Sequence, residues 1–93
     1  MTDADLLVRR AIDRYNRFRA PMARATLVGQ NTGGYRIRFT GPFRRTCCPD
    51  EYLEDLRYEM DELGLDQSTT AWTDIQAGTP ETIEATLRVA AGP

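Results

Sequence analysis

The apolar residues near the start of the chain recur every three or four positions, which is the spacing of one helix face. They are Leu7, Ala11, Ile12, Tyr15 and Phe18. A stripe of this width buries one side of a helix and leaves the other sides in water. Pro21 ends the pattern, because a proline disfavours the α conformation of the residue before it. The sequence therefore predicts a helix from Asp3 to about Arg19.

After Met22 the apolar positions follow a period of two, which is typical of strands that bury one face. They are Ala23, Ala25 and Leu27, then Tyr35, Ile37 and Phe39. Pairing Leu27 with Ile37 places all six on one face of a β-hairpin and requires a five-residue loop, Gln30–Gly34, in place of a two-residue turn. The other face then carries Arg24, Thr26, Val28, Arg36, Arg38 and Thr40.

A second amphipathic pattern predicts a helix from Pro49 to about Leu63. Pro49 suits the first helical position, Cys48 would cap the helix, and Gly64 ends it. The stripe to be buried is Tyr52, Leu53, Leu56, Met60 and Leu63. The other faces carry one arginine, Arg57, and six acids: Glu51, Glu54, Asp55, Glu59, Asp61 and Glu62. Acids four residues apart and acids at the C-terminal end disfavour an isolated helix, so we expect basic side chains to lie against this one.

The last third of the chain predicts a strand over about Thr69–Ala77 and then a segment, residues 81–90, with two interpretations. Thr79-Pro80-Glu81 is typical of a helix start. The strict alternation of Ile83, Ala85, Leu87 and Val89 with polar residues, and its β-branched content, favour a strand instead. We adopt the strand, which would close a second hairpin.

The predicted order is α-β-β-α-β-β, an α+β fold in which a four-stranded antiparallel sheet carries both helices on one face. A chain of 93 residues is long enough for a single core, so residues 1–93 should form one domain. No window approaches the roughly 20 apolar residues of a membrane span, and the start is acidic where a signal peptide is basic. We therefore expect a cytoplasmic protein that does not bind membranes.

The charges are divided unequally along the chain. All twelve basic residues are arginines; residues 1–48 hold ten of them and three acids (+7), and residues 49–93 hold two and eleven acids (−9). The two halves could neutralise each other within the fold or across a dimer interface. The expected contacts join Arg10, Arg14 or Arg17, or the hairpin arginines, to Glu51, Asp55, Glu59 or Glu62.

The same arginines could instead bind nucleic acid or another anion. The candidates are Arg24, Arg36 and Arg38 on the sheet, with Arg44 and Arg45 before the second helix. Tyr35 and Phe39 alternate onto the apolar face, so the pattern contains no aromatic platform for stacking bases among the arginines.

Cys47 and Cys48 are the candidates for a reactive thiol, because a helix N-terminus beside arginines lowers a thiol pKa. The chain has no histidine to act as a base, and adjacent cysteines do not form an unstrained disulfide. We favour a core position for one and a helix cap for the other. No catalytic residue, metal site or cofactor is predicted; a zinc site would need the cysteines of two chains.

The composition has no lysine, is rich in arginine, threonine and alanine, and contains eight Asp against six Glu. Together with Gly41–Leu56 (Gly-Pro-Phe-Arg-Arg-Thr-Cys-Cys-Pro-Asp-Glu-Tyr-Leu-Glu-Asp-Leu) it resembles small haloarchaeal proteins of unknown function, a resemblance that implies no activity. From the charges we expect a non-catalytic interaction or scaffold module that forms a homodimer or other homo-oligomer through its basic and acidic halves. The alternative is an RNA- or DNA-binding protein that uses its arginine-rich surface, and an enzyme using Cys47 or Cys48 stands third.

Overall fold

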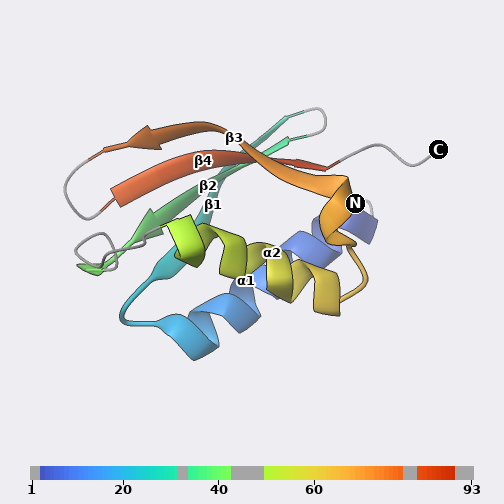
Figure 1. Ribbon diagram of the computed structural model, residues 1–93, viewed down its shortest axis with the longest axis horizontal. Helices are drawn as coiled ribbons and strands as arrows, with labels where there is room; N and C mark the ends of the chain where they lie inside the picture. The colour runs from blue at the N-terminus through green and yellow to red at the C-terminus, as the bar shows by residue number, and fades with distance from the viewer. Residues whose placement is uncertain (1–2, 32–33, 43–49, 79–81, 90–93) are drawn as a thin grey trace.

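Two antiparallel helices cover one face of a four-stranded antiparallel sheet in the computed structural model, which describes residues 3–31, 34–42, 50–78 and 82–89 (Figure 1). The elements are α1 (Asp3–Arg19), β1 (Arg24–Asn31), β2 (Gly34–Thr40), α2 (Asp50–Glu62), the 3₁₀ helix η2 (Gln67–Thr69), β3 (Thr70–Ala77) and β4 (Thr82–Val89). This is the predicted α-β-β-α-β-β fold. The two helices lie side by side below the sheet in Figure 1, and no described element covers its other face.

The strands are arranged in the order β1-β2-β4-β3, so β4 lies in the middle of the sheet. Residues 82–89 form a strand, as the alternation of their apolar residues favoured. Ile83, Ala85 and Leu87 are buried toward the helices. A central strand pairs on both sides, which explains why the β-branched alternation prevails here over the helix-start signal at 79–81.

The predicted register of the first hairpin is confirmed, but its five-residue loop is wrong. Leu27 pairs with Ile37 and Ala25 with Phe39, then the register shifts between Leu27 and Gly29. This shift is a β-bulge, which adds one residue to β1 at Val28. The ladder consequently continues to the pair Asn31↔Gly34, and only residues 32–33, which lie outside the described residues, separate the two strands.

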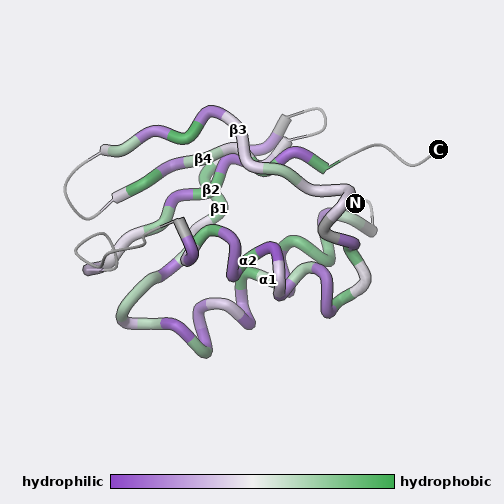
Figure 2. The backbone as a smooth tube through the Cα atoms, in the orientation of Figure 1, coloured by the Kyte–Doolittle hydropathy of each residue, from purple (hydrophilic) through white to green (hydrophobic). Residues whose placement is uncertain are grey.

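The core lies between the helices and the sheet, and the hydrophobic residues of α1 and α2 alternate with hydrophilic ones along each helix (Figure 2). Its largest fully buried side chains are Tyr15, Phe39, Ile37, Leu56, Met60, Leu87 and Val8. The Phe39 ring packs edge-on against Tyr15 and Trp72, with ring centres 5.7 and 5.5 Å away. Two residues of the predicted α1 stripe are wrong: Phe18 is 67% exposed, and Leu7 is not part of the core, which contains Val8 instead. Arg19 continues the buried stripe instead, with its guanidinium 4.9 Å from the centre of the Tyr15 ring.

Helix α2 ends at Gly64, as predicted. The Leu65 N–H donates to the Met60 carbonyl (2.9 Å) and the Gly64 N–H to the Asp61 carbonyl (3.0 Å). These two bonds form a Schellman motif, in which Gly64 has a φ of +108°. Leu65 folds back and packs against the core.

Side chains from the helices form hydrogen bonds with the backbone of both outer strands, β1 and β3. The Asn16 amide accepts a hydrogen bond from the Ala25 N–H (2.7 Å) and donates one to the Ala25 carbonyl (3.0 Å), at the edge of β1. Arg57 donates to the Thr70 carbonyl (2.9 Å) at the start of β3. Backbone groups that are already hydrogen-bonded cannot pair with another strand, so each contact protects its part of a sheet edge.

Candidate functional site

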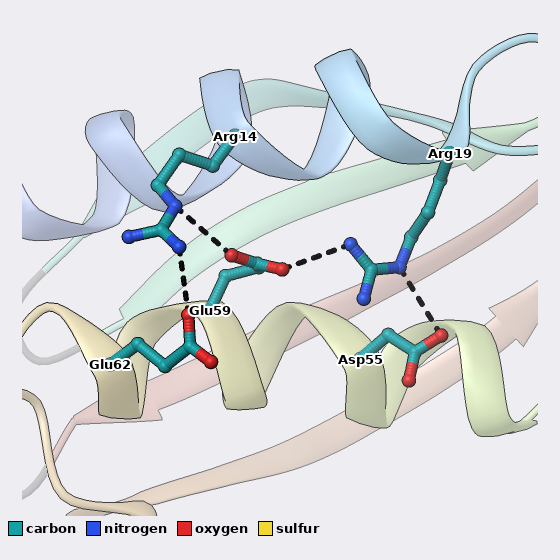
Figure 3. Close-up of polar contacts among 5 residues, drawn as sticks. All are labelled: Arg14, Arg19, Asp55, Glu59 and Glu62. Carbon is teal, nitrogen blue, oxygen red and sulfur yellow. Dashed lines mark hydrogen bonds and ion pairs between the residues drawn. The ribbon is translucent and has the colours of Figure 1, made fainter.

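The opposite charges of the two halves pair between α1 and α2, within one chain (Figure 3). Arg14 contacts Glu59 (3.1 Å) and Glu62 (2.7 Å). Arg19 contacts Asp55 (3.2 Å) and Glu59 (3.1 Å). The predicted pairing is therefore confirmed for Arg14, and Arg19 is a partner that the sequence analysis missed because it assigned that part of the stripe to Phe18.

Glu59 is the centre of this interhelix network. Its side chain is 10% exposed and lies between the two guanidinium groups, while that of Glu62 is 63% exposed. The contact with Arg19 is a hydrogen bond, and the Arg14 Nε contact with Glu59 Oε1 is an ion pair without hydrogen-bond alignment. Beneath it, burial raises the pKa of the Tyr15 hydroxyl, so this phenol stays neutral. The network holds the two helices together. Its arginines and acids neutralise each other and are therefore less available to bind a partner.

The hairpin arginines lie on the other side of the molecule, on the face of the sheet that the helices leave open. Strand alternation and register place on this open face Arg24, Thr26, Arg36, Arg38, Thr40, Ala71, Thr73, Gln76, Thr82, Glu84, Thr86 and Arg88. Arg88 was missing from the predicted site, although its alternation with Leu87 and Val89 was a usable signal. The open face is thus made of arginine, threonine and few other residue types.

Arg36 lies on the open face and bonds to residues of β3 and β4. Its Nε contacts Glu84 (3.3 Å), and its Nη1 donates to the Asp74 carbonyl (2.9 Å) and the Thr86 hydroxyl (3.0 Å). Its Nη2 donates to the Gln76 side chain (3.2 Å). Asp74, with a φ of 49°, lies where the β3 register shifts against β4, so Arg36 spans β4 and stabilises this bulge. Its donors are used within the fold.

Arg24, Arg38 and Arg88 keep donors for a ligand. Arg38 contacts Glu84 through Nε alone (3.0 Å), and its side chain is 46% exposed. Arg24 and Arg88 are exposed, and no hydrogen bond or ion pair joins the guanidinium group of either to another described residue. The three guanidinium groups provide planar sets of N–H donors that suit phosphate or carboxylate oxygens.

Glu84 is the acid between Arg36 and Arg38 on the open face. The hydrogen bond from Arg38, and after it the bond from Arg36, lowers the pKa of Glu84 against an opposing effect of desolvation. Glu84 is therefore ionised at neutral pH, and it keeps the neighbouring guanidinium groups in place.

Replacing Arg38 by glutamine should raise the pKa of Glu84 toward the ordinary glutamate value of about 4.3. Because the folded-state pKa is lowered, this pairing stabilises the fold above the unfolded pKa, and the stabilisation is lost as the pH falls through the folded value. A carboxyl ¹³C NMR titration measures the change. Arg24→Gln is the control, since Arg24 makes no described contact with Glu84. Equal Glu84 midpoints in Arg38→Gln and the unmodified protein would contradict the assignment.

A separate hollow of about 370 Å³ lies between α2 and β3. It is lined by Leu53, Glu54, Arg57, Ala71, Trp72 and Ile75. Its polar walls are already satisfied: Trp72 donates to the Leu53 carbonyl (3.1 Å) and Arg57 contacts Glu54 (2.7 Å) and Thr70 (3.0 Å). The hollow is large enough for an apolar side chain.

Four predicted site residues, Arg44, Arg45, Cys47 and Cys48, lie outside the described residues. Within the described ranges, no group of three or more Cys, Asp or Glu side chains could hold a metal ion. The same part of the chain contains no helix long and apolar enough to cross a membrane.

The comparisons with known proteins add no assignment. No protein-family model and no curated protein matches this sequence.

Proposed function

We propose that the protein is a non-catalytic binding module whose open sheet face binds nucleic acid, RNA or DNA, through its phosphates. The observation that carries the proposal is the position of Arg24, Arg38 and Arg88 on one sheet face that no described element covers, with N–H donors not used by described residues. Arginine is the side chain best suited to phosphate, because its planar donors match the phosphate oxygens.

The distribution of charge supports this choice of face. Four arginines stand on it against Glu84, a net charge of +3, or +2 if Asp74 in the edge bulge is counted. The acids of α2 lie on the opposite layer, where Arg14 and Arg19 neutralise part of their charge. A molecule with this separation of charge turns its basic face toward a polyanion, even with a net charge of −2.

The homo-oligomer predicted from the charge halves has less support. Four α2 acids were expected to pair, and three of them, Asp55, Glu59 and Glu62, contact arginines of the same chain. No ion pair joins the fourth, Glu51, to another described residue. The opposite charges therefore need no second chain to account for them. Self-association stays a prediction, which light scattering tests. An enzyme using Cys47 or Cys48 also stays a prediction, tested by thiol alkylation rates.

The proposal predicts that replacing Arg24, Arg38 and Arg88 together by glutamine weakens nucleic-acid binding by about tenfold or more in low salt. Fluorescence anisotropy with mixed-sequence single- and double-stranded probes measures it. The matched control replaces Arg9, Arg10 and Arg17, three exposed arginines of α1, by glutamine. Both variants lose three positive charges, so long-range attraction falls alike and only contacts differ. Undetectable binding by the unmodified protein, or equal losses in the two variants, would refute the proposal.

A further inference from the structure

The four arginines of the open face lie on one diagonal line across three strands. Arg24 on β1 is opposite Thr40, at one end of β2, and Arg88 on β4 is opposite Gly34, at the other end. Arg38 and Arg36 lie on β2 between these two cross-strand pairs. In order along the diagonal, the row is Arg24, Arg38, Arg36 and Arg88.

The spacing of this arginine row follows from sheet geometry. Neighbouring strands are about 4.8 Å apart and each residue rises about 3.4 Å, so successive Cα atoms of the row are about 7–8 Å apart. The whole row spans about 22 Å. A duplex strand carries one phosphate per 3.4 Å of axis, so a row of this length faces about six phosphates of one strand.

The two middle arginines of the row are held in place. Arg36 is anchored to β4 and to the β3 bulge, and Glu84 holds both Arg36 and Arg38. Hydroxyl groups of Thr26 and Thr40 flank the row and could also donate to phosphate oxygens. Because Arg38 is already held by Glu84, it loses less freedom when it binds a phosphate than an unrestrained arginine would.

The described part of the open face has no aromatic side chain. Phe39 packs with Tyr15 and Trp72 on the helix side of the sheet. Tyr35, also on that side, donates to Asp5. Single-strand binding without sequence preference depends on bases that stack on aromatic rings, and nothing here provides such a platform.

We infer that the arginine row binds the phosphate backbone of a double helix and does not read its base sequence. This inference rests on the proposed function and adds the class of nucleic acid. Three of the four arginines have donors free for phosphates, and three phosphate contacts give a slope of log affinity against log salt concentration of about −2.7. Between 50 and 200 mM salt the affinity should then fall about 40-fold.

The test compares duplex DNA of about 20 base pairs with each of its two separated strands and with a duplex of shuffled sequence. We expect the duplex to bind at least about tenfold tighter than either strand, and the two duplexes to agree within about twofold. Arg24→Gln and Arg88→Gln should each reduce the salt slope by about 1, while Arg10→Gln, on α1, should leave it unchanged.

Single strands that bind as tightly as the duplex would overturn this inference and leave the proposed function standing. A preference for one duplex sequence, or a salt slope that Arg24→Gln and Arg88→Gln leave unchanged, would overturn it as well. Absence of binding to every probe would overturn the proposed function together with it. Thermal melting of each variant verifies that it is folded.

Discussion

Replacing Glu59 by alanine should lower the free energy of unfolding by about 3 kcal/mol, because both arginines of the interhelix network lose a nearly buried partner. Arg14 and Arg19 both contact Glu59, whose side chain is 10% exposed. Without Glu59, Arg14 keeps only Glu62 and Arg19 only Asp55 among the described acids, so each partly buried guanidinium is less well compensated. Urea denaturation followed by circular dichroism gives the free energy of unfolding.

The matched control for Glu59→Ala is Glu62→Ala, one turn along the same helix. Among the described residues Glu62 contacts only Arg14, and its side chain is 63% exposed, so its loss should cost no more than about 1 kcal/mol. Equal effects of the two substitutions would show that the interhelix network does not depend on Glu59.

Gly41→Ala should destabilise the fold by about 3 kcal/mol or more, because it combines backbone strain with a collision. Gly41, directly after β2, has a φ of +131°, which L side chains rarely adopt. An added Cβ would lie 2.4 Å from the carbonyl oxygen of Met22, in the turn between α1 and β1. Backbone cannot move away as a flexible side chain can, so the turn and the end of β2 would have to separate.

Gly64→Ala is the control for Gly41→Ala. Gly64 also has a positive φ, +108°, but an added Cβ would meet nothing within 4 Å. It should therefore cost only the conformational strain, about 1–2 kcal/mol. Urea denaturation of both variants measures the difference. If Gly41→Ala costs no more than Gly64→Ala, the close approach to Met22 does not constrain the fold.

The element order was predictable because each helix and strand of this chain carries a clear period. The end of α2 was equally clear from Gly64 and Leu65. The strand order was not, since the alternation in Ile83–Val89 shows that one face is buried without showing which strands lie beside it. That order places Arg88 in line with the hairpin arginines.

The β-bulges could not be predicted from the pattern of apolar and polar residues. A register with Leu27 opposite Ile37 implies a long loop unless one residue is accommodated within a strand, and Val28 is that residue. The bulge at Asp74 likewise depends on Arg36, a residue distant in the sequence. Features that depend on contacts between distant segments leave little trace in local periodicity.

The candidate site was predictable in part. Arg24 and Arg38 lie on the open face as the alternation indicated, and Arg36, from the same set, is used within the fold. An arginine with four partners and an arginine with none among the described residues look alike in the sequence. Arg88 was overlooked because it falls in the segment that could have been helix or strand.

The most direct test of the central claim, that the open sheet face binds nucleic acid, is a ¹H–¹⁵N NMR titration of the protein with a short DNA duplex in low salt. The largest shift changes should fall on open-face residues of β1, β2 and β4, among them Arg24, Arg38 and Arg88. Residues of α2 such as Glu62 should change little. Changes concentrated on α1 and α2 or around Trp72 and Ile75, with the open face unaffected, would contradict the claim.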